Sequence, residues 1–272
     1  MDGADFLLAG VVEDICERLR AVKRQFDLAA DIGTPLPSLA RQLAASDQVG
    51  RVVRIDGLAD TAPDIVADLD ALPLAPASLD LAVSALALQW ADDLPGLLAQ
   101  IRIALKPDGL FLAAFIGGET LTEIRQSLAQ AEDEVRGGAR PRVSPFVELR
   151  SAGALLQRAG FALPVIDQER RTVRYASALH LMRDLRAMGA TNVLHDRDRR
   201  PLPRAVLVRA AAIYAERFSD ADGRVRATFD VISLSGWAPD RSQPKPLKPG
   251  SATARLADAL GSVERPAGEK AG

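Results

Sequence analysis

The stretch VADLDALPLAPASLDLAVSALALQWADDLPGLLAQIRIALKPDGLFLAAF, residues 66–115, contains the pattern from which we infer the fold. The continuous apolar run at 79–86 predicts a strand buried on both faces, because a strand with one solvent face would alternate polar and apolar residues. The segment LLAQIRIAL (97–105) predicts a helix that the Pro and Gly of LKPDG (105–109) end. A second buried strand, GLFLAAF, follows at 109–115. A strand, a helix and another buried strand in this order indicate parallel strands joined by a helical crossover.

The alternation of strands and helices extends toward the N-terminus. Apolar residues at helical spacing predict a helix within 5–26, and a short apolar strand follows at 28–32. A Gly/Pro loop then leads to a helix near 36–45 and to the strand RVVRID at 51–56, which ends in an acid. The Asp- and Pro-rich segment 60–76 predicts a loop. Repeated strand–helix units are typical of a parallel sheet with helices on both faces.

The second half of the chain departs from this regular order. The segment 224–238 alternates polar and apolar residues, which is typical of an edge or antiparallel strand. The remaining predicted elements are a strand at 162–176 and helices at 119–136, 145–159, 177–189 and 203–217. We expect a single domain over 1–240, with a helical insertion at about 177–217, followed by a Pro/Lys-containing C-terminal tail over 241–272.

Composition and charge exclude several classes of protein. The 272 residues include 34 Lys and Arg against 36 Asp and Glu, so the chain lacks the basic excess typical of proteins that bind nucleic acid or anionic membranes. The apolar runs are interrupted before they reach the ~20 residues that a membrane-spanning helix needs. The single cysteine, Cys16, excludes an internal disulfide framework, and we expect it to be a small core residue. No basic region precedes the first apolar stretch, so we expect no secretory signal and a cytoplasmic protein.

Acidic residues follow two of the predicted strands. Asp31 and Gly33 come after the first strand, and Asp56 ends the second. In an open α/β sheet, ligands bind beyond the carboxyl ends of the strands, where a glycine lets the backbone approach the ligand and an acid accepts hydrogen bonds from ribose hydroxyls. The simpler alternative is that Asp31 caps a helix or turn and that Asp56 forms a turn with Gly57.

Several motifs carry a resemblance to a known family. Residues 20–165, including the stretch quoted above, resemble class I methyltransferases of the methyltransferase-11 type, which depend on S-adenosylmethionine (SAM). The segments ALALQWADDLPG (85–96), GGETLTEIR (117–125) and WAPDRSQPKPLKPGSA (237–252) resemble bacterial relatives of NADH dehydrogenase (complex I) assembly factor 5. The malonyl-carrier-protein methyltransferase of biotin synthesis is a more distant likeness. The resemblance implies an α/β, Rossmann-like fold with a mostly parallel twisted sheet of about seven strands, one antiparallel edge strand and helices on both faces.

The same resemblance implies where the cofactor loop lies. Asp31 and Gly33 match the opening of the family's SAM loop, but Pro35 and Pro37 stand where the family has glycines. Each proline fixes φ near −65° and removes an N–H, so it cannot form a loop that needs a positive φ or an N–H directed at the ligand. We therefore expect either that the loop takes a different path and binds SAM weakly, or that SAM binding is lost.

Five further residues match cofactor positions of the family. Asp56 matches the acid that binds the ribose, Asp68 the acid that contacts the adenine amino group, and Leu69 the residue that packs on the ring. Ser84 and Ala85 end a buried strand, where the family lines the methyl-donor pocket. The alternative for Asp68 is a solvated loop residue.

The sequence leaves three functions open. The first is a SAM-dependent methyltransferase-like protein that modifies a protein side chain during assembly of respiratory NADH dehydrogenase, with a subunit of that complex as partner. Family members are implicated in hydroxylating an arginine rather than methylating it, and we identify no catalytic base. Such a protein would be cytoplasmic or held peripherally at the inner membrane through its partner.

The second function is that of a non-catalytic assembly or chaperone protein with a degenerate SAM site. The third is a small-molecule or carrier-protein methyltransferase, which predicts a closed apolar pocket under the helices after Gly118.

Other prominent residues have simpler explanations. Trp90 is expected to anchor the core at the end of a strand, the alternative being a ring that stacks on substrate. His195 lies in an acidic and basic loop that we interpret as solvated, so we expect no metal. The arginines Arg170, Arg171 and Arg174 predict a solvated strand face, with a docking patch for a partner protein as the alternative.

Overall fold

The computed structural model describes residues 5–244, 258 and 261–262. The chain divides into two units, Met1–Pro239 and Asp240–Gly272, and the first unit carries all the features described below. Most of the tail expected over 241–272 lies outside the described residues. The division of the chain into a domain and a tail therefore remains a prediction.

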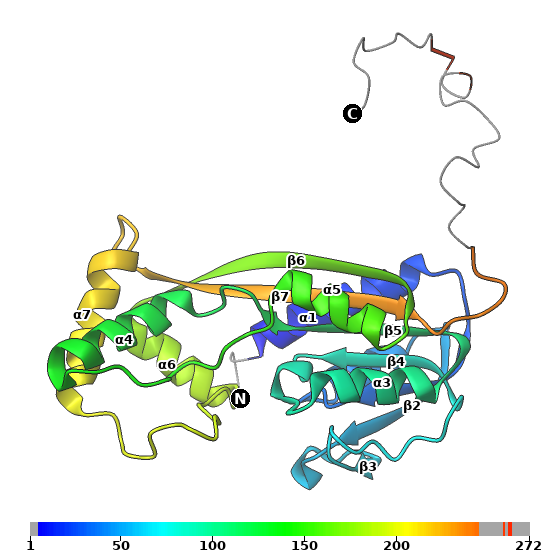
Figure 1. Ribbon diagram of the computed structural model, residues 1–272, viewed down its shortest axis with the longest axis horizontal. Helices are drawn as coiled ribbons and strands as arrows, with labels where there is room; N and C mark the ends of the chain where they lie inside the picture. Colours follow the sequence, from blue (N-terminus) through cyan, green and yellow to red (C-terminus); the bar gives the residue numbers. More distant parts are fainter. Residues whose placement is uncertain (1–4, 245–257, 259–260, 263–272) are drawn as a thin grey trace, which may run out of the picture. The chain divides into compact units, whose positions relative to one another are not determined.

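A seven-stranded sheet with the order β3-β2-β1-β4-β5-β7-β6 forms the centre of the first unit (Figure 1). Its strands are β1 (Phe26–Ile32), β2 (Val49–Asp56), β3 (Ile65–Val66), β4 (Leu79–Ala85), β5 (Leu105–Gly117), β6 (Ala162–Tyr175) and β7 (Val225–Trp237). The strands β1 to β5 pair in parallel, whereas β7 pairs antiparallel with both β5 and β6. The expected mostly parallel sheet of about seven strands, with antiparallel pairing at one edge, is confirmed.

Nine helical segments surround this sheet. They are α1 (Phe6–Ala21), α2 (Ser38–Ala44), α3 (Leu94–Ala104), α4 (Thr122–Arg136), α5 (Leu149–Arg158), α6 (Ala178–Ala187) and α7 (Arg204–Phe218), with the short 3₁₀ helices η1 (Ala59–Thr61) and η2 (Leu88–Trp90), counted over residues 5–244. The expected loop at 60–76 is wrong at one point, because it contains β3. A two-residue edge strand is too short to produce a periodic pattern.

Two hydrophobic cores fill the two faces of the sheet. Alternate residues of β4 enter different cores, with Leu81 and Val83 on the face covered by α1 and α2, and Ala82 on the face covered by α3 and α5. Side chains of successive strand residues point to opposite faces, so a strand buried on both sides must be apolar throughout. The continuous apolar run at 79–86 therefore follows from burial on both faces.

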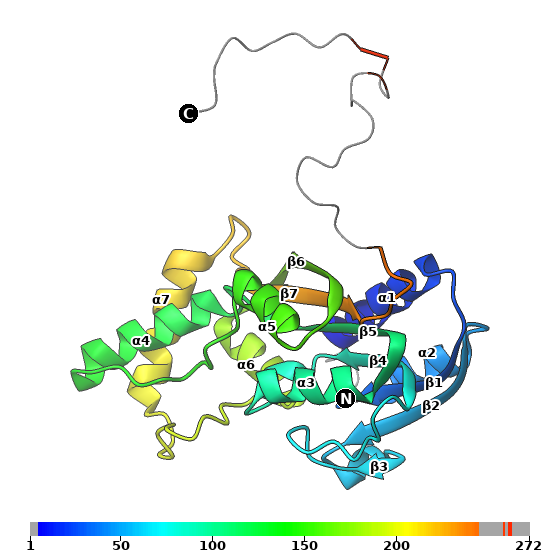
Figure 2. The same cartoon turned by 45° about the vertical axis from the view of Figure 1, so that its right-hand side comes forward.

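Three helices extend the molecule past the sheet. Figures 1 and 2 show α4, α6 and α7 grouped at one end of the first unit, reached through the chain that leaves β5 and through the long strands β6 and β7. We call these three helices the helical cap. Within the cap, α4 packs against α7. The apolar residues of the cap belong to the hydrophobic core on the face of the sheet that α1 covers. Within the described part of the chain, no helix is long and apolar enough to cross a membrane.

Candidate functional site

The carboxyl ends of β1 and β4 are joined by a threonine. Asp31 is buried at the end of β1, with 1% of its surface exposed, and accepts a hydrogen bond from the hydroxyl of Thr34. The same hydroxyl oxygen accepts a hydrogen bond from the backbone N–H of Ala85 at 3.1 Å. Thr34 therefore fixes the path of the loop after β1 against the end of β4. Sequence reasoning missed this residue, although its position three residues after Asp31 allows its hydroxyl to reach the carboxylate.

A buried arginine lies between the two acids of the site. Arg54 of β2 places Nε 3.9 Å from Asp31 Oδ2 and Nη2 4.0 Å from Asp56 Oδ2. Its guanidinium also donates to the backbone oxygens of Thr34, at 3.2 Å, and Thr61, at 2.8 Å. Burial raises the pKa of Asp31 to about 7, although the Thr34 hydrogen bond and the Arg54 charge act in the opposite direction. Asp31 therefore changes its charge close to neutral pH.

Asp56 ends β2, as expected, and organises the turn that follows. Its Oδ2 accepts a hydrogen bond from the Thr61 hydroxyl at 2.8 Å, and its Oδ1 accepts one from the N–H of Leu58 at 3.1 Å. The alternative interpretation, that Asp56 forms a turn with Gly57, is therefore confirmed. A carboxylate offers about four acceptor positions, so these two bonds leave room for further donors. The role of Asp56 in binding ribose remains a prediction.

Gly33 and Leu69 lie together. Gly33 has φ = +71°, and a Cβ at this position would lie 2.9 Å from the Cβ of Ala87 and 3.0 Å from Cδ2 of Leu69. Only glycine fits a backbone of this shape and crowding. The neighbouring Asp68 is exposed and accepts a hydrogen bond from the N–H of Asp70 at 3.0 Å. The expected contacts of Asp68 and Leu69 with adenine remain predictions.

Ser84 and Ala85 are fully buried at the end of β4. The Ser84 hydroxyl donates to the backbone oxygen of Ile32 at 2.7 Å and so holds β4 to β1. A large cavity of about 780 Å³ is lined by Leu86 and Gln89, which follow these two residues, but not by Ser84 or Ala85 themselves. A direct role of Ser84 and Ala85 in cofactor binding therefore remains a prediction.

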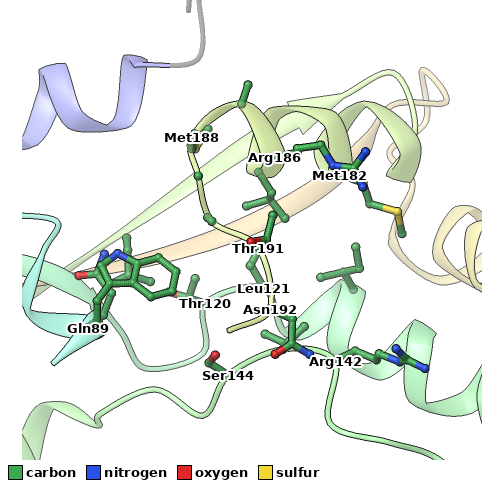
Figure 3. A pocket seen from close by; sticks show the side chains of 18 of the residues that line it. Gln89, Thr120, Leu121, Arg142, Ser144, Met182, Arg186, Met188, Thr191 and Asn192 are labelled. Carbon is green, nitrogen blue, oxygen red and sulfur yellow. The ribbon is translucent and has the colours of Figure 1, made fainter. Parts of the chain in front are cut away.

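The large cavity lies where the loops after β1, β4 and β5 meet the helical cap. It has a volume of about 780 Å³ and a mostly apolar wall. The wall includes Leu36 from the β1 loop, Trp90 from the β4 loop, Thr120 from the β5 loop and Met182 from α6. Figure 3 shows Gln89 on one side of this cavity, with Arg142 and Arg186 across from it.

Trp90 is exposed to 40% of its surface and forms part of this wall. The expectation that it anchors the core is therefore wrong. Trp90 is the last residue of the 3₁₀ helix η2, which follows the end of β4. Trp90 is one of the residues that a ligand in the cavity would meet.

The two prolines of the β1 loop occupy different positions. Pro37 directly precedes α2 with φ = −73°, which a proline ring adopts and which suits the start of a helix. Pro35 is exposed on the cavity wall. These positions give no support to the expectation that the prolines abolish or weaken cofactor binding.

The three arginines of β6 are held by acids of the same chain. Arg170 lies 2.7 Å from the buried Asp230, while Arg171 pairs with Asp14 and Glu169, and Arg174 pairs with Asp220 and Asp222. The strand face is therefore a row of internal ion pairs. The side chains of Arg170 and Arg174 remain 55% and 44% exposed, as expected for a solvated face, whereas that of Arg171 is 21% exposed. A docking patch for a partner protein on this face remains a prediction.

The fold agrees with comparisons to known proteins. Residues 26–113 match the methyltransferase-11 family, described as a methyltransferase domain. The YcgJ protein of Bacillus subtilis has a TM-score of 0.56 at 12% identity, over 84% of this chain and 99% of that chain. Phosphoethanolamine N-methyltransferase 2 of Haemonchus contortus, solved with S-adenosyl-L-methionine, has a TM-score of 0.52 at 16% identity, over 84% of this chain and 52% of that chain. Both structures share the class I methyltransferase fold.

Sequence relatives define the family more narrowly. Proteins named arginine-hydroxylase NDUFAF5, mitochondrial, are 39% identical in Danio rerio, over 93% of this chain and 82% of the relative, and 37% identical in Homo sapiens, over 98% and 80%. A malonyl-[acyl-carrier protein] O-methyltransferase of Methylovorus sp. (strain MP688) is 33% identical over 88% and 84%. The chain belongs to the family of class I methyltransferase-fold proteins that contains the NDUFAF5 arginine-hydroxylases.

Proposed function

We propose that this protein binds SAM at the carboxyl ends of β1, β2 and β4 and modifies a protein side chain during assembly of respiratory NADH dehydrogenase. The observation that carries the proposal is the Asp31–Arg54–Asp56 group at the carboxyl ends of β1 and β2, where open α/β folds bind ligands. The loop that follows Asp31 leads from this group to the cavity, whose wall includes Pro35 and Leu36. The name of the NDUFAF5 relatives favours arginine as the side chain that is modified.

The residues present fit SAM. Asp31 Oδ2 is buried and accepts no hydrogen bond from the described residues, and such an atom is costly unless a donor reaches it. A bound molecule with an ammonium or hydroxyl group would supply that donor. Gly33 and Asp56 would form part of the surface on which the cofactor rests, and Asp68 and Leu69 would contact its adenine. SAM would supply an electrophilic methyl group.

The contribution of the chain would be orientation and exclusion of water. The apolar wall of the cavity removes solvent from a bound side chain, and Trp90 and Thr120 restrict its position close to the ends of β4 and β5. Holding two reactants in a reactive geometry supplies up to about 7–11 kcal/mol of a barrier. Methyl transfer to an arginine would require the guanidinium to lose a proton, because the protonated group has no lone pair for the methyl group. We assign none of the described side chains as the base that accepts this proton.

Titration calorimetry with SAM tests the cofactor site. We expect saturable binding to the wild-type protein and at least ~10-fold weaker binding to Asp56→Ala, about 1.4 kcal/mol or more. The exposed Asp60 of η1 provides a matched control, and Asp60→Ala should bind SAM like the wild type. Absence of binding at millimolar SAM would contradict the proposal and favour the non-catalytic assembly protein.

The role in assembly is tested separately. Affinity purification should recover subunits of NADH dehydrogenase, and Asp56→Ala should fail to restore assembly in a strain that lacks the gene although the variant folds. Full restoration by a folded Asp56→Ala variant would again favour the non-catalytic protein.

A second candidate function follows from the apolar wall of the cavity. A small-molecule or carrier-protein methyltransferase predicts a closed apolar pocket under the helices after Gly118. The apolar wall of the cavity, which includes Ile124 and Leu128 of α4, supports the apolar part of this prediction. The Methylovorus relative carries the name of such an enzyme. Transfer of radioactive methyl from SAM to malonyl-acyl carrier protein by the purified protein would favour this function over modification of a protein side chain.

A further inference from the structure

The cavity wall carries an excess of positive charge on the side of the cap. Arg186, at the end of α6, and Arg199 are exposed, and Arg197 donates to the backbone oxygen of Leu194 at 2.9 Å. Within the described part of the chain, none of these three arginines forms an ion pair. We call Arg186, Arg197 and Arg199 the arginine rim. Its charge is free to attract a ligand.

Two acids flank Arg197 in sequence, and among the described residues neither forms an ion pair with the arginine rim. Asp196 contacts His195 at 3.1 Å. Asp198 lies 3.4 Å from Arg136, 3.6 Å from Arg140 and 3.6 Å from Arg142. Arg142 also lies 2.6 Å from the fully buried Glu132. These five residues form an ion-pair network that ties α4 to the loop after α6. Asp198 therefore pairs with the arginines of this network and not with Arg197 or Arg199.

The rim belongs to a basic segment in an otherwise acidic chain. Residues 183–204 contain six arginines and three aspartates, whereas the whole chain has a net charge of −2. Such clustering contrasts with β6, where every arginine of the row is paired with an acid. Unpaired arginines with a planar fork of donors are well suited to bind carboxylates.

We infer that the arginine rim binds an acidic segment of the protein that carries the acceptor side chain into the cavity. The inference rests on the proposed function for the identity of the cavity as the acceptor site. An arginine acceptor that entered the cavity without acidic neighbours would be repelled by the positive charges of Arg186, Arg197 and Arg199. Glutamates or aspartates that flank the acceptor would offset this repulsion and place the acceptor beyond the rim, on the side of the cavity where Gln89 lies.

Fluorescence anisotropy with defined peptides tests this inference on the full chain. The probe is a fluorescein-labelled peptide with one arginine flanked by glutamates on both sides, and the matched peptide has lysines in place of the glutamates. The glutamate peptide should bind, and its affinity should fall when salt is raised from about 20 mM to about 200 mM, because exposed charges are screened. The lysine peptide should not bind measurably.

Charge reversal locates the binding surface. The double variant Arg186→Glu/Arg199→Glu should weaken binding of the glutamate peptide by about 10-fold or more, since two attractive contacts become repulsive. The control is Arg150→Glu on α5, an exposed arginine outside the cavity wall, which should change affinity less than ~2-fold.

The outcomes separate this inference from the proposed function. SAM binding by calorimetry should be unchanged in the double variant, and peptide binding should be unchanged in Asp56→Ala. Equal binding of the peptide by the double variant and the wild type would overturn the inference. Binding of phosphatidylglycerol vesicles without binding of the peptide would overturn it as well, because the rim would then be a membrane contact.

Discussion

Asp31 is a carboxylic acid buried in the protein, with 1% of its surface exposed. Burial disfavours the ionised form of such a group. Burial raises its pKa from the usual 3.8 to about 7. Between these two values the folded protein binds more protons than the unfolded chain, so the contribution of Asp31 to stability falls as pH rises. We expect Asp31→Asn to remove this decline and to gain stability relative to the wild type at pH 8, on the order of a few kcal/mol.

Urea unfolding of the two proteins at intervals from pH 4 to pH 8 measures this difference. The two curves of unfolding free energy should meet near the acid end and separate as the pH rises. The exposed Asp60→Asn change should reproduce the wild-type curve. Parallel curves for Asp31→Asn and the wild type would mean that the Arg54 charge fully offsets the cost of burying the carboxylate.

At the scale of elements, the turn between β5 and α4 depends on β7. Asp230 of β7 is fully buried, and its Oδ2 accepts a hydrogen bond from the N–H of Glu119 at 2.9 Å. Gly118 has φ = +56°, and a Cβ there would lie 2.7 Å from the same oxygen. We expect Gly118→Ala to lower the free energy of unfolding by about 1–3 kcal/mol, because it adds a strained φ to a collision with a charged atom.

Thermal unfolding checks this expectation. Gly138, past the end of α4, would place a Cβ in open space and lacks a positive φ, so Gly138→Ala should leave the midpoint almost unchanged. If Gly118→Ala melted at the wild-type temperature, the turn would have to move away from Asp230 at no cost. The cavity wall at Thr120, two residues further on, would then be expected to shift as well.

The elements show what the sequence could predict and why the rest escaped it. The sequence placed strands β1, β2, β4 and β5 to within a few residues. Burial on both faces requires a continuous apolar run, as in β4 and β5, and an acid marks the end of β2. The positions of Asp31 and Asp56 followed, since parallel strands end at one edge of the sheet. The role of Arg54 did not follow. Within RVVRID it resembles any polar strand residue, and only the folded chain brings Asp31, Thr34 and Thr61 around it.

Most of the residues that line the cavity could not be predicted, for a similar reason. Its wall combines loops that follow three strands with the end of α6 and the segment after it, which are distant in sequence. The family resemblance placed cofactor residues at Ser84 and Ala85, whereas the residues that reach the cavity, such as Gln89 and Trp90, follow the strand. Periodicity describes which face an element buries. It carries no information about where two loops meet.

At the scale of the whole molecule, the sheet and the cap should differ in local stability. Strands β1, β4 and β5 are central and buried on both faces, so their amides should exchange with solvent only through global opening. The segment 189–203, which forms much of the outer cavity wall, contains no helix or strand and few buried side chains. Its amides should exchange through small local openings.

Hydrogen exchange measured by mass spectrometry on the full chain should therefore show slow β1, β4 and β5 peptides and a fast 189–203 peptide. Since the arginine rim lies largely in this segment, saturation with the glutamate peptide should slow its exchange and leave the central strands unchanged. A segment that is already as slow as β4 in the free protein would contradict this division, because the cavity would then have a rigid wall on all sides.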